Sequence, residues 1–409
     1  MNPKHYGQAR MRALRTITAS RPGRLLVGVV GVVALLTIVG LVALWPSGQG
    51  PKVAGAGVKT LAGTVTQVRS ASCGGPTKQQ CRTAKIRLDE GQDKGLQVDV
   101  VLGPAEVSPD LQVDQRVRMA DQNAGVPVAP EAGPQEPSYA FSSVDRRTPV
   151  IALAVLFALL GAVVARGRGV LALLGTAMSL SLVVLWLVPA ILDGGSPILV
   201  ATVGALAVMF VTTILTYGIT AQSLAAVTGI GVSLVAAALL GTLWTDLAGL
   251  DGKDGDLSAF TLQSGGELPL QGILLAGMVI GALGVLTDTV VSQVSTVAAL
   301  HRANATLGAR GLYREAFVVG RDHLSATIHT LVLAYAGATL PLLLIASANG
   351  VTLSDAINDA RLAEPIVSTL VGSAALVLSV PLSTALASVL VGRLPPDALS
   401  SDDGHSHHH

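Results

Sequence analysis

The chain has 409 residues, of which 50% are hydrophobic and 13% are charged, and its formal net charge is +1 at pH 7. Soluble domains usually carry about 25% charged residues, so this composition excludes an ordinary soluble globular protein. The small net charge also argues against the basic surface that a nucleic-acid-binding protein needs.

The chain begins with a basic segment followed by a long apolar run. Residues 1–24 contain six Lys or Arg residues and no acid. The run 25–45 is long enough to cross a bilayer at about 1.5 Å per residue. We expect an uncleaved anchor with a cytoplasmic amino terminus, because Lys and Arg collect on that side. A cleaved signal peptide is the alternative, although such peptides have a shorter apolar core and a small-residue cleavage site.

Residues 46–121 differ in composition and predict a small β-domain after the first helix. Four segments alternate apolar and polar residues: 60–69, 84–88, 96–102 and 112–119. Alternation with a period of two, punctuated by Gly, Pro and Asp, is typical of short strands. We expect an extracytoplasmic all-β domain, comparable to a barrel of the oligonucleotide/oligosaccharide-binding type. The strands lack the aromatic residues that stack on nucleic acid bases, and a fold alone names no ligand.

The two cysteines of the chain, Cys73 and Cys81, both lie in this region and flank a loop with Gly and Pro. A single pair in an extracytoplasmic domain favours a disulfide that closes a hairpin. Two free thiols and a metal site are the alternatives, and the metal site is disfavoured because residues 46–148 contain no His. Residues 122–148 begin with a stretch rich in Pro, Gly and Ala, which predicts a linker.

Seven further apolar runs occupy residues 149–391, so we predict about eight transmembrane helices in total. The seven runs are 149–165, 170–192, 197–217, 219–244, 269–291, 324–347 and 365–391. An acidic loop at 245–268 and a loop at 348–364 with a short helical pattern interrupt them. Residues 392–409 form the expected cytoplasmic tail.

The distribution of Lys and Arg supports one orientation of these spans. With the amino terminus inside, the inner connector before the seventh span carries four arginines: Arg302, Arg310, Arg314 and Arg321. The short outer loops carry only Lys253 and Arg361. This bias follows the positive-inside rule. Arg146 and Arg147 are discordant, and we attribute them to translocation of the long β-domain being committed by the first span.

The sixth span carries a carboxylate on a face of small residues. Gly277, Gly281, Gly284 and Asp288 are spaced by four, three and four residues, so they share one side of a helix. Small residues let another helix approach, and Asp288 would then point at that helix. An ionised carboxylate facing lipid costs at least ~2.5 kcal/mol, which favours a proton or cation site. The alternatives are that Asp288 lies at the membrane interface or that it caps a helix beginning at Thr289.

The seventh span opens with several polar side chains. Asp322, Ser325 and His329 share one helical face, and His323 lies on the adjacent face. A histidine inside a span can carry a proton or ligate a metal. Capping explains Asp322 and Ser325 as well, and an interhelical hydrogen bond explains His329. We therefore keep both histidines, Asp322 and Asp288 as candidates for an ion or proton site, with any metal unspecified.

Four hydroxyl groups are candidates for lining a cavity, and the alternative is that they only bond helix to helix. They belong to Thr212, Thr213, Thr287 and Ser325. The sequence has no Walker lysine loop, no GxSxG elbow and no HExxH motif, so we expect neither an enzyme nor a cofactor.

Four motifs together resemble the YibE/F-like family of bacterial membrane proteins. They are DRRTP at 145–149, VPAILDGGSP at 188–197, GALGVLTDTVVS at 281–292 and VGRDHLSATIHTLVLAYAGATLP at 319–341. The resemblance covers about residues 140–391. It implies an integral protein of the bacterial inner membrane with an extracytoplasmic amino-terminal domain. It implies no settled activity, so it assigns no residue a catalytic or binding role.

Two functional hypotheses remain. The first is a permease-like transporter of a small ion or solute, with its site near the cytoplasmic side of helices six and seven. The second is a non-transporting accessory membrane protein whose β-domain binds a periplasmic or cell-envelope protein. The lipid bilayer is the expected partner in both cases, a homo-oligomer is compatible with both, and no nucleic acid is expected.

Overall fold

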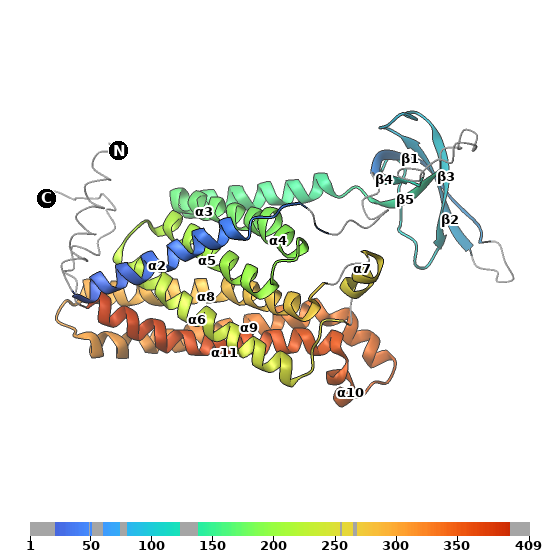
Figure 1. Cartoon of the computed structure of the whole chain (residues 1–409). Coiled ribbons are helices and arrows are strands. Elements are labelled where there is room, and N and C mark those ends of the chain that lie inside the picture. The colour runs from blue at the N-terminus through green and yellow to red at the C-terminus, as the bar shows by residue number, and fades with distance from the viewer. Residues whose placement is uncertain are drawn as a thin grey trace. The chain divides into compact units, whose positions relative to one another are not determined.

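The structure is a computed structural model of the chain, shown in Figure 1. It describes residues 21–48, 50, 60–73, 80–122, 138–253, 256–264 and 268–392. The chain forms two compact units, a β-unit of residues 52–163 and a helical unit of residues 1–51 and 164–409. Within the described residues, eight helices are long and apolar enough to cross a membrane, as the apolar runs predict.

The β-unit contains a five-stranded antiparallel sheet with the strand order β3-β2-β1-β4-β5. Its strands are β1 (Thr60–Ser72), β2 (Gln80–Leu88), β3 (Gln97–Pro104), β4 (Arg116–Asp121) and β5 (Tyr139–Val144). Strand β3 also contacts β5, so the sheet curls into a half-barrel. The residues at its centre are fully buried: Val65, Ile86, Val117 and Met119. They alternate with less buried neighbours along the strands, which is the period of two that predicts them.

Strand β5 lies inside the predicted linker 122–148, so that part of the prediction is wrong. It pairs with β4 from Val117 opposite Val144 to Asp121 opposite Tyr139. The strand has only six residues and follows a Pro-rich stretch, which is why its own pattern is a weak signal. The rest of the predicted linker, residues 123–137, falls outside the described residues.

A disulfide joins Cys73 to Cys81, as predicted, with their Cα atoms 4.8 Å apart. The two cysteines lie at the end of the β1–β2 ladder, where Ala71 pairs with Cys81 and Ser72 with Gln80. The bond therefore closes the loop between the two longest strands of the sheet.

The helical unit is a bundle of long helices joined by short connections (Figure 1). Its elements are α2 (Arg21–Ala43), the second part of α3 (Arg147–Leu182), the π-helical turn η1 (Val183–Leu187), α4 (Val188–Leu192), α5 (Pro197–Tyr217), α6 (Ala221–Leu247), α7 (Asp256–Ser264), α8 (Leu270–Ala303), α9 (Ala309–Ala348), α10 (Leu353–Asn358) and α11 (Ala360–Val391). Helix α3 kinks at Arg166, where φ is 53°. This kink falls at the predicted break between the second and third spans.

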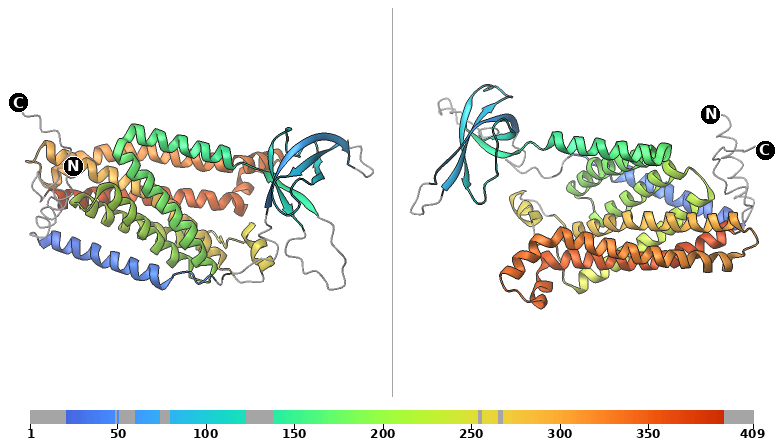
Figure 2. Two further views of the ribbon diagram at one scale, coloured as in Figure 1. Left: turned by 90° about the horizontal axis from the view of Figure 1, so that it is seen from above. Right: turned by 180° about the vertical axis from the view of Figure 1, so that it is seen from behind.

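Close helix packing at the centre of the bundle depends on glycine. Helix α11 packs against α6, α8 and α9, and the two views of Figure 2 show these helices side by side. At Gly229 of α6, an added Cβ atom would lie 3.0 Å from Cγ1 of Val290 on α8 and 3.3 Å from Cβ of Ser383 on α11. Small residues at such crossings are what membrane helices need, because lipid supplies no hydrophobic drive between them.

The end of α2 is fastened to the α4 turn by hydrogen bonds. The hydroxyl of Ser47 and the backbone N–H of Gly48 donate to Oδ2 of Asp193, at 2.9 and 2.8 Å. Partial burial opposes ionisation, but these bonds and one from the backbone of Gly50 hold the pKa of the Asp193 carboxyl below its usual range. The indole of Trp186 also donates to the carbonyl of Leu41, at 3.2 Å.

Three helix ends differ from the sequence prediction. Helix α8 continues to Ala303 and α9 begins at Ala309, so most of the predicted connector 292–323 is helical. The arginines in this region predict where the apolar layer ends, which is not where a helix must end. Helix α11 begins before Pro365, because the side chain of Asp359 accepts a hydrogen bond from the backbone N–H of Arg361 at 3.0 Å and caps it.

Candidate functional site

Asp288 lies near the middle of α8, a continuous helix of 34 residues. The helix runs through the carboxylate without a break, so Asp288 does not cap a helix beginning at Thr289, and that alternative is wrong. At 1.5 Å per residue the helix is about 51 Å long, against a hydrocarbon core of about 30 Å. Asp288 is within about one turn of the midpoint of this helix, which extends well beyond the predicted span 269–291.

The polar residues of the seventh span are also interior to a helix. Helix α9 begins at Ala309, so Asp322 and Ser325 are well past its first turn. Their capping interpretation is therefore wrong, because only the residue that begins a helix can cap its free N–H groups.

Two contacts fix the alignment of α8 and α9, which run antiparallel. An added Cβ atom on Gly281 of α8 would lie 3.5 Å from the hydroxyl of Tyr335 on α9. An added Cβ atom on Gly320 of α9 would lie 2.7 Å from Oε1 of Gln293 on α8. Interpolation between these contacts places Asp288 level with the α9 segment between His323 and His329, which are about 9 Å apart along the helix.

The same side chains do not meet in an enclosed site within one chain. Asp288, Asp322, Ser325 and His329 are exposed on the surface of the unit, and His323 is half-buried. Nε2 of His323 is buried and has no hydrogen-bond partner among the described residues. No group of three or more His, Cys, Asp or Glu residues in the described part of the chain could hold a metal ion. The four candidates therefore do not form one coordination shell.

Asp288 belongs to a longer exposed stripe of small and polar residues on α8. We call it the α8 stripe, and it comprises Gly277, Gly281, Gly284, Asp288, Ser292 and Ser295. No atom of the described residues lies within 4 Å of a Cβ atom built on Gly277 or Gly284. The predicted approach of a second helix thus occurs at Gly281 and not at Gly277 or Gly284.

The candidate cavity hydroxyls on α5 and α8 are mostly satisfied by their own helices. Thr212 donates to the carbonyl of Val208 and Thr287 to that of Leu283, each at 2.8 Å. Thr213 is 1% exposed, and its hydroxyl has no hydrogen-bond partner among the residues that the structure describes. Of these, only Thr213 offers an unused buried hydroxyl to a ligand.

The comparison with protein families shows which family the chain belongs to. Residues 153–393 match the family model described as YibE/F-like protein, which is more than half of the chain. The chain belongs to the YibE/F-like family. The family match includes all of α8, α9 and α11, and with the eight apolar helices it indicates a multi-pass membrane protein. No curated protein and no solved structure matches the chain.

Within the region that matches the YibE/F-like family, the structure adds a buried amide that the sequence prediction missed. Gln293 is 3% exposed, and its Nε2 donates to the backbone carbonyl of Ala316 on α9 at 2.7 Å. One turn earlier, Thr289 is 1% exposed with no partner for its hydroxyl among the described residues. Gln293 lies on the same buried helical face as Leu286 and Val290. The sequence would show this pattern if the sixth span were extended past residue 291.

Helix α11 contributes further buried hydroxyls to the same core. Ser379, Ser383, Thr384 and Ser388 recur at helical spacing and are all at most 1% exposed. The first three donate to carbonyls of their own helix. The hydroxyl of Ser388 has no such partner in the described residues. The buried core of the bundle therefore includes several hydroxyl groups and one amide among its apolar side chains.

Proposed function

We propose that this YibE/F-like protein is a permease-like transporter of a small ion or solute, in which Asp288 carries a proton. The observation that supports the proposal most is the position of this carboxylate, in the middle of a continuous membrane-length helix. It has no capping role there, and the described residues provide no ion-pair partner for it. An ionisable group at membrane depth is costly and is therefore a candidate for function.

The histidines of α9 are the proposed exchange partners. His323 and His329 lie above and below the height of Asp288, and an imidazole exchanges protons near neutral pH. The buried, unpartnered Nε2 of His323 is a free site to receive or release one. Within one chain these residues are not part of a metal-binding cluster of described residues, and we propose that they exchange protons.

The proposed site needs a cover, because a carboxylate on the α8 stripe cannot face lipid at low cost. We place a second copy of the chain against this stripe. The glycines of the α8 stripe allow a helix of the second copy to approach closely. The acids of one copy and the protonated histidines of the other have complementary charge. The proton site would then lie between two protomers, shielded from lipid.

The direct test of transport uses the full chain in proteoliposomes. A pH-sensitive dye inside the vesicles reports proton movement while Na⁺, K⁺, Mg²⁺, chloride, phosphate and small carboxylates are added outside one at a time. If the protein is a transporter, the addition of at least one solute should change the internal pH faster than in protein-free vesicles. No response to any solute, together with a stoichiometric protein partner, would favour an accessory role.

The second candidate function is that of an accessory membrane protein, and the exposed apolar side chains of the β-unit favour it. Val101, Val107 and Val113 are 67%, 81% and 57% exposed. Exposed apolar side chains lose their unfavourable contact with water when a partner covers them, which favours a binding surface. In this case the β-domain would lie outside the cytoplasm, with the amino terminus inside, and would bind a cell-envelope protein.

A pull-down distinguishes the two functions. Full-length protein and a variant lacking residues 60–144 are expressed at equal levels and purified with their bound partners. A partner lost with the β-domain, and no solute-coupled flux, would support the accessory role. Flux that survives deletion of the β-domain would support transport by the helical unit.

A further inference from the structure

A groove of about 400 Å³ lies between the beginning of α9 and the end of α11. Its lining residues are Ala309, Arg310, Tyr313, Arg314, Ala385, Ser388 and Val389. None of them is among the ion-site candidates, so this groove is separate from the proposed proton site. Its volume is within the range of small-molecule sites, which is about 300–1,000 Å³.

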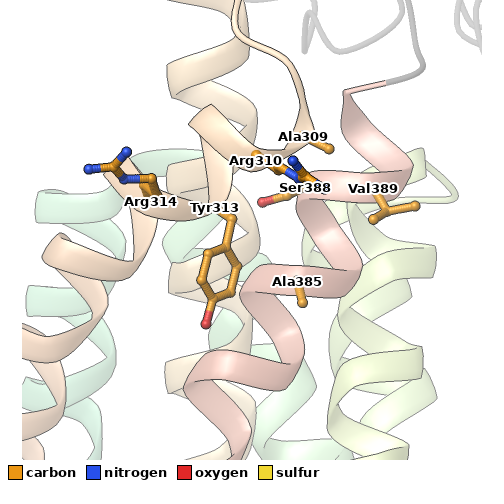
Figure 3. A pocket seen from close by; sticks show the side chains of 7 residues that line it. All are labelled: Ala309, Arg310, Tyr313, Arg314, Ala385, Ser388 and Val389. Carbon is orange, nitrogen blue, oxygen red and sulfur yellow. The ribbon is translucent and has the colours of Figure 1, made fainter.

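Two arginines of α9 flank the groove, whose own surface is mainly apolar. Arg310 and Arg314 are four residues apart on α9 and both are exposed. Neither guanidinium has an ion-pair partner among the residues that the structure describes. Figure 3 shows Arg310 beside Ser388 and Arg314 on the other side of Tyr313. An arginine fork matches the oxygens of a phosphate group, which favours an anionic ligand.

The groove also contains an unused buried hydroxyl. Ser388 is 1% exposed, and its hydroxyl lacks a hydrogen-bond partner in the described residues. Such a group is rare in a folded protein. Tyr313 reaches between α9 and α11 in Figure 3, and its ring stacks on Phe317 with centroids 5.4 Å apart. Its phenol is thereby held at the groove.

The α11 side of the groove is apolar. Ala385 is exposed, and Val389 is 41% exposed. A freely soluble anion would gain nothing from these side chains. A phospholipid has both parts, a phosphate for the arginines and an acyl chain for the apolar wall, and basic pockets between membrane helices bind anionic lipid headgroups. We propose that this groove binds one anionic phospholipid, with its phosphate at Arg310, its acyl chain along α11, and Arg314 adding positive charge beside the headgroup.

Native mass spectrometry of the purified full chain tests this assignment. The protein is titrated with phosphatidylglycerol or with phosphatidylcholine of the same acyl chains. Phosphatidylglycerol should bind more tightly. The double variant Arg310→Gln/Arg314→Gln should bind it about 25-fold more weakly, because each surface cation contributes about fivefold. Arg321→Gln, on the same helix but outside the groove, should bind as the unchanged protein does.

A second variant fills the apolar side without altering charge. Ala385→Phe should weaken phosphatidylglycerol binding, and the elution volume and thermal midpoint of each variant show that it is folded. Equal binding by Arg310→Gln/Arg314→Gln and Arg321→Gln would overturn the proposal. Normal lipid binding by Ala385→Phe, with displacement by millimolar inorganic phosphate, would make the groove a soluble-anion site and would also overturn it.

The acidic carboxy-terminal segment is the rival occupant. If phosphatidylglycerol binds only after Asp397, Asp402 and Asp403 are changed to Asn, that segment occupies the groove and the lipid assignment is wrong. The readout is binding alone, so a failure of the proposed transport function would leave this result unaffected.

Discussion

At the scale of single residues, Gly320 is a position where neighbouring helices leave no room for a side chain. An added Cβ atom would lie 2.7 Å from Gln293 Oε1 and 2.8 Å from Val380 Cγ1. Gln293 is itself held by its bond to Ala316, so it cannot move away without losing that bond. Three helices, α8, α9 and α11, therefore depend on the absence of a side chain at one position.

We predict that Gly320→Val destabilises the protein by about 1–3 kcal/mol, the usual cost of overpacking a well-packed core. Thermal unfolding of the purified protein in detergent measures the change. Gly337→Val on the same helix is the matched control, because no atom of the described residues lies within 4 Å of a Cβ atom there. Equal effects of the two variants would show that the close contact at Gly320 does not limit packing.

Tyr139 gives the β-unit a dependence on alkaline pH. Its hydroxyl donates to Oδ2 of Asp93 at 2.6 Å, and this hydrogen bond, with partial burial and the nearby charges of Asp93 and Asp121, raises the pKa of Tyr139 to about 12. The folded pKa is above the ordinary value of 10.0. The stabilising contribution is therefore complete below about pH 10 and is lost as the pH rises toward 12.

We expect the denaturant concentration at which half of the β-unit is unfolded to decrease as the pH is raised from 10 to 12. The decrease should be larger in the unchanged protein than in Tyr139→Phe. Denaturation followed by circular dichroism at several pH values measures both. An identical pH dependence of the two proteins would mean that the Tyr139–Asp93 hydrogen bond does not stabilise the fold.

At the scale of elements, the sequence predicts the number of membrane helices because each span needs only length and apolar composition. The helix ends are harder to predict, as residues 292–323 show. Their arginines indicate polar surroundings, yet α8 continues because Val294, Val297 and Ala298 keep its buried face. The sequence analysis does not predict strand β5, because six residues are too few to show a clear alternation of apolar and polar side chains. The strand is recognised only through its pairing with β4.

The same limit applies to the candidate site. Helical spacing correctly groups Gly277, Gly281, Gly284 and Asp288 on one face. It does not show whether another helix covers that face, because coverage depends on contacts between segments far apart in the sequence. Gln293 and the buried serines of α11 are invisible to a search for ionisable groups, although they are at the centre of the packing.

The α8 stripe yields a prediction about assembly. Both native cysteines are joined in a disulfide, so Gly284→Cys adds a single reactive thiol. We expect it to form a cross-linked dimer in membranes, because a second copy covers the stripe in the proposed site. Gly31→Cys on α2 is the control, an exposed glycine with no described atom within 4 Å of its Cβ position. Cross-linking at Gly31 but not at Gly284 would contradict the proposed cover.

At the scale of the whole molecule, the two units suit different tasks. The helical unit includes most of the region that matches the YibE/F-like family, and it contains the ionisable groups, the buried hydroxyls and the lipid groove. The β-unit is closed by a disulfide and exposes valines. We therefore propose that the helical unit transports the solute and that the β-unit binds other proteins.

The proton carried by Asp288 is the central claim, and solute-coupled proton flux in proteoliposomes tests it most directly. The assay uses whichever solute moves protons with the unchanged protein, and it compares Asp288→Asn with Glu315→Gln, an exposed acid near the start of α9. Both variants must be reconstituted in equal amounts and must unfold at the same temperature as the unchanged protein. The account predicts that Asp288→Asn abolishes the flux while Glu315→Gln preserves it. Unchanged flux in Asp288→Asn would contradict the account.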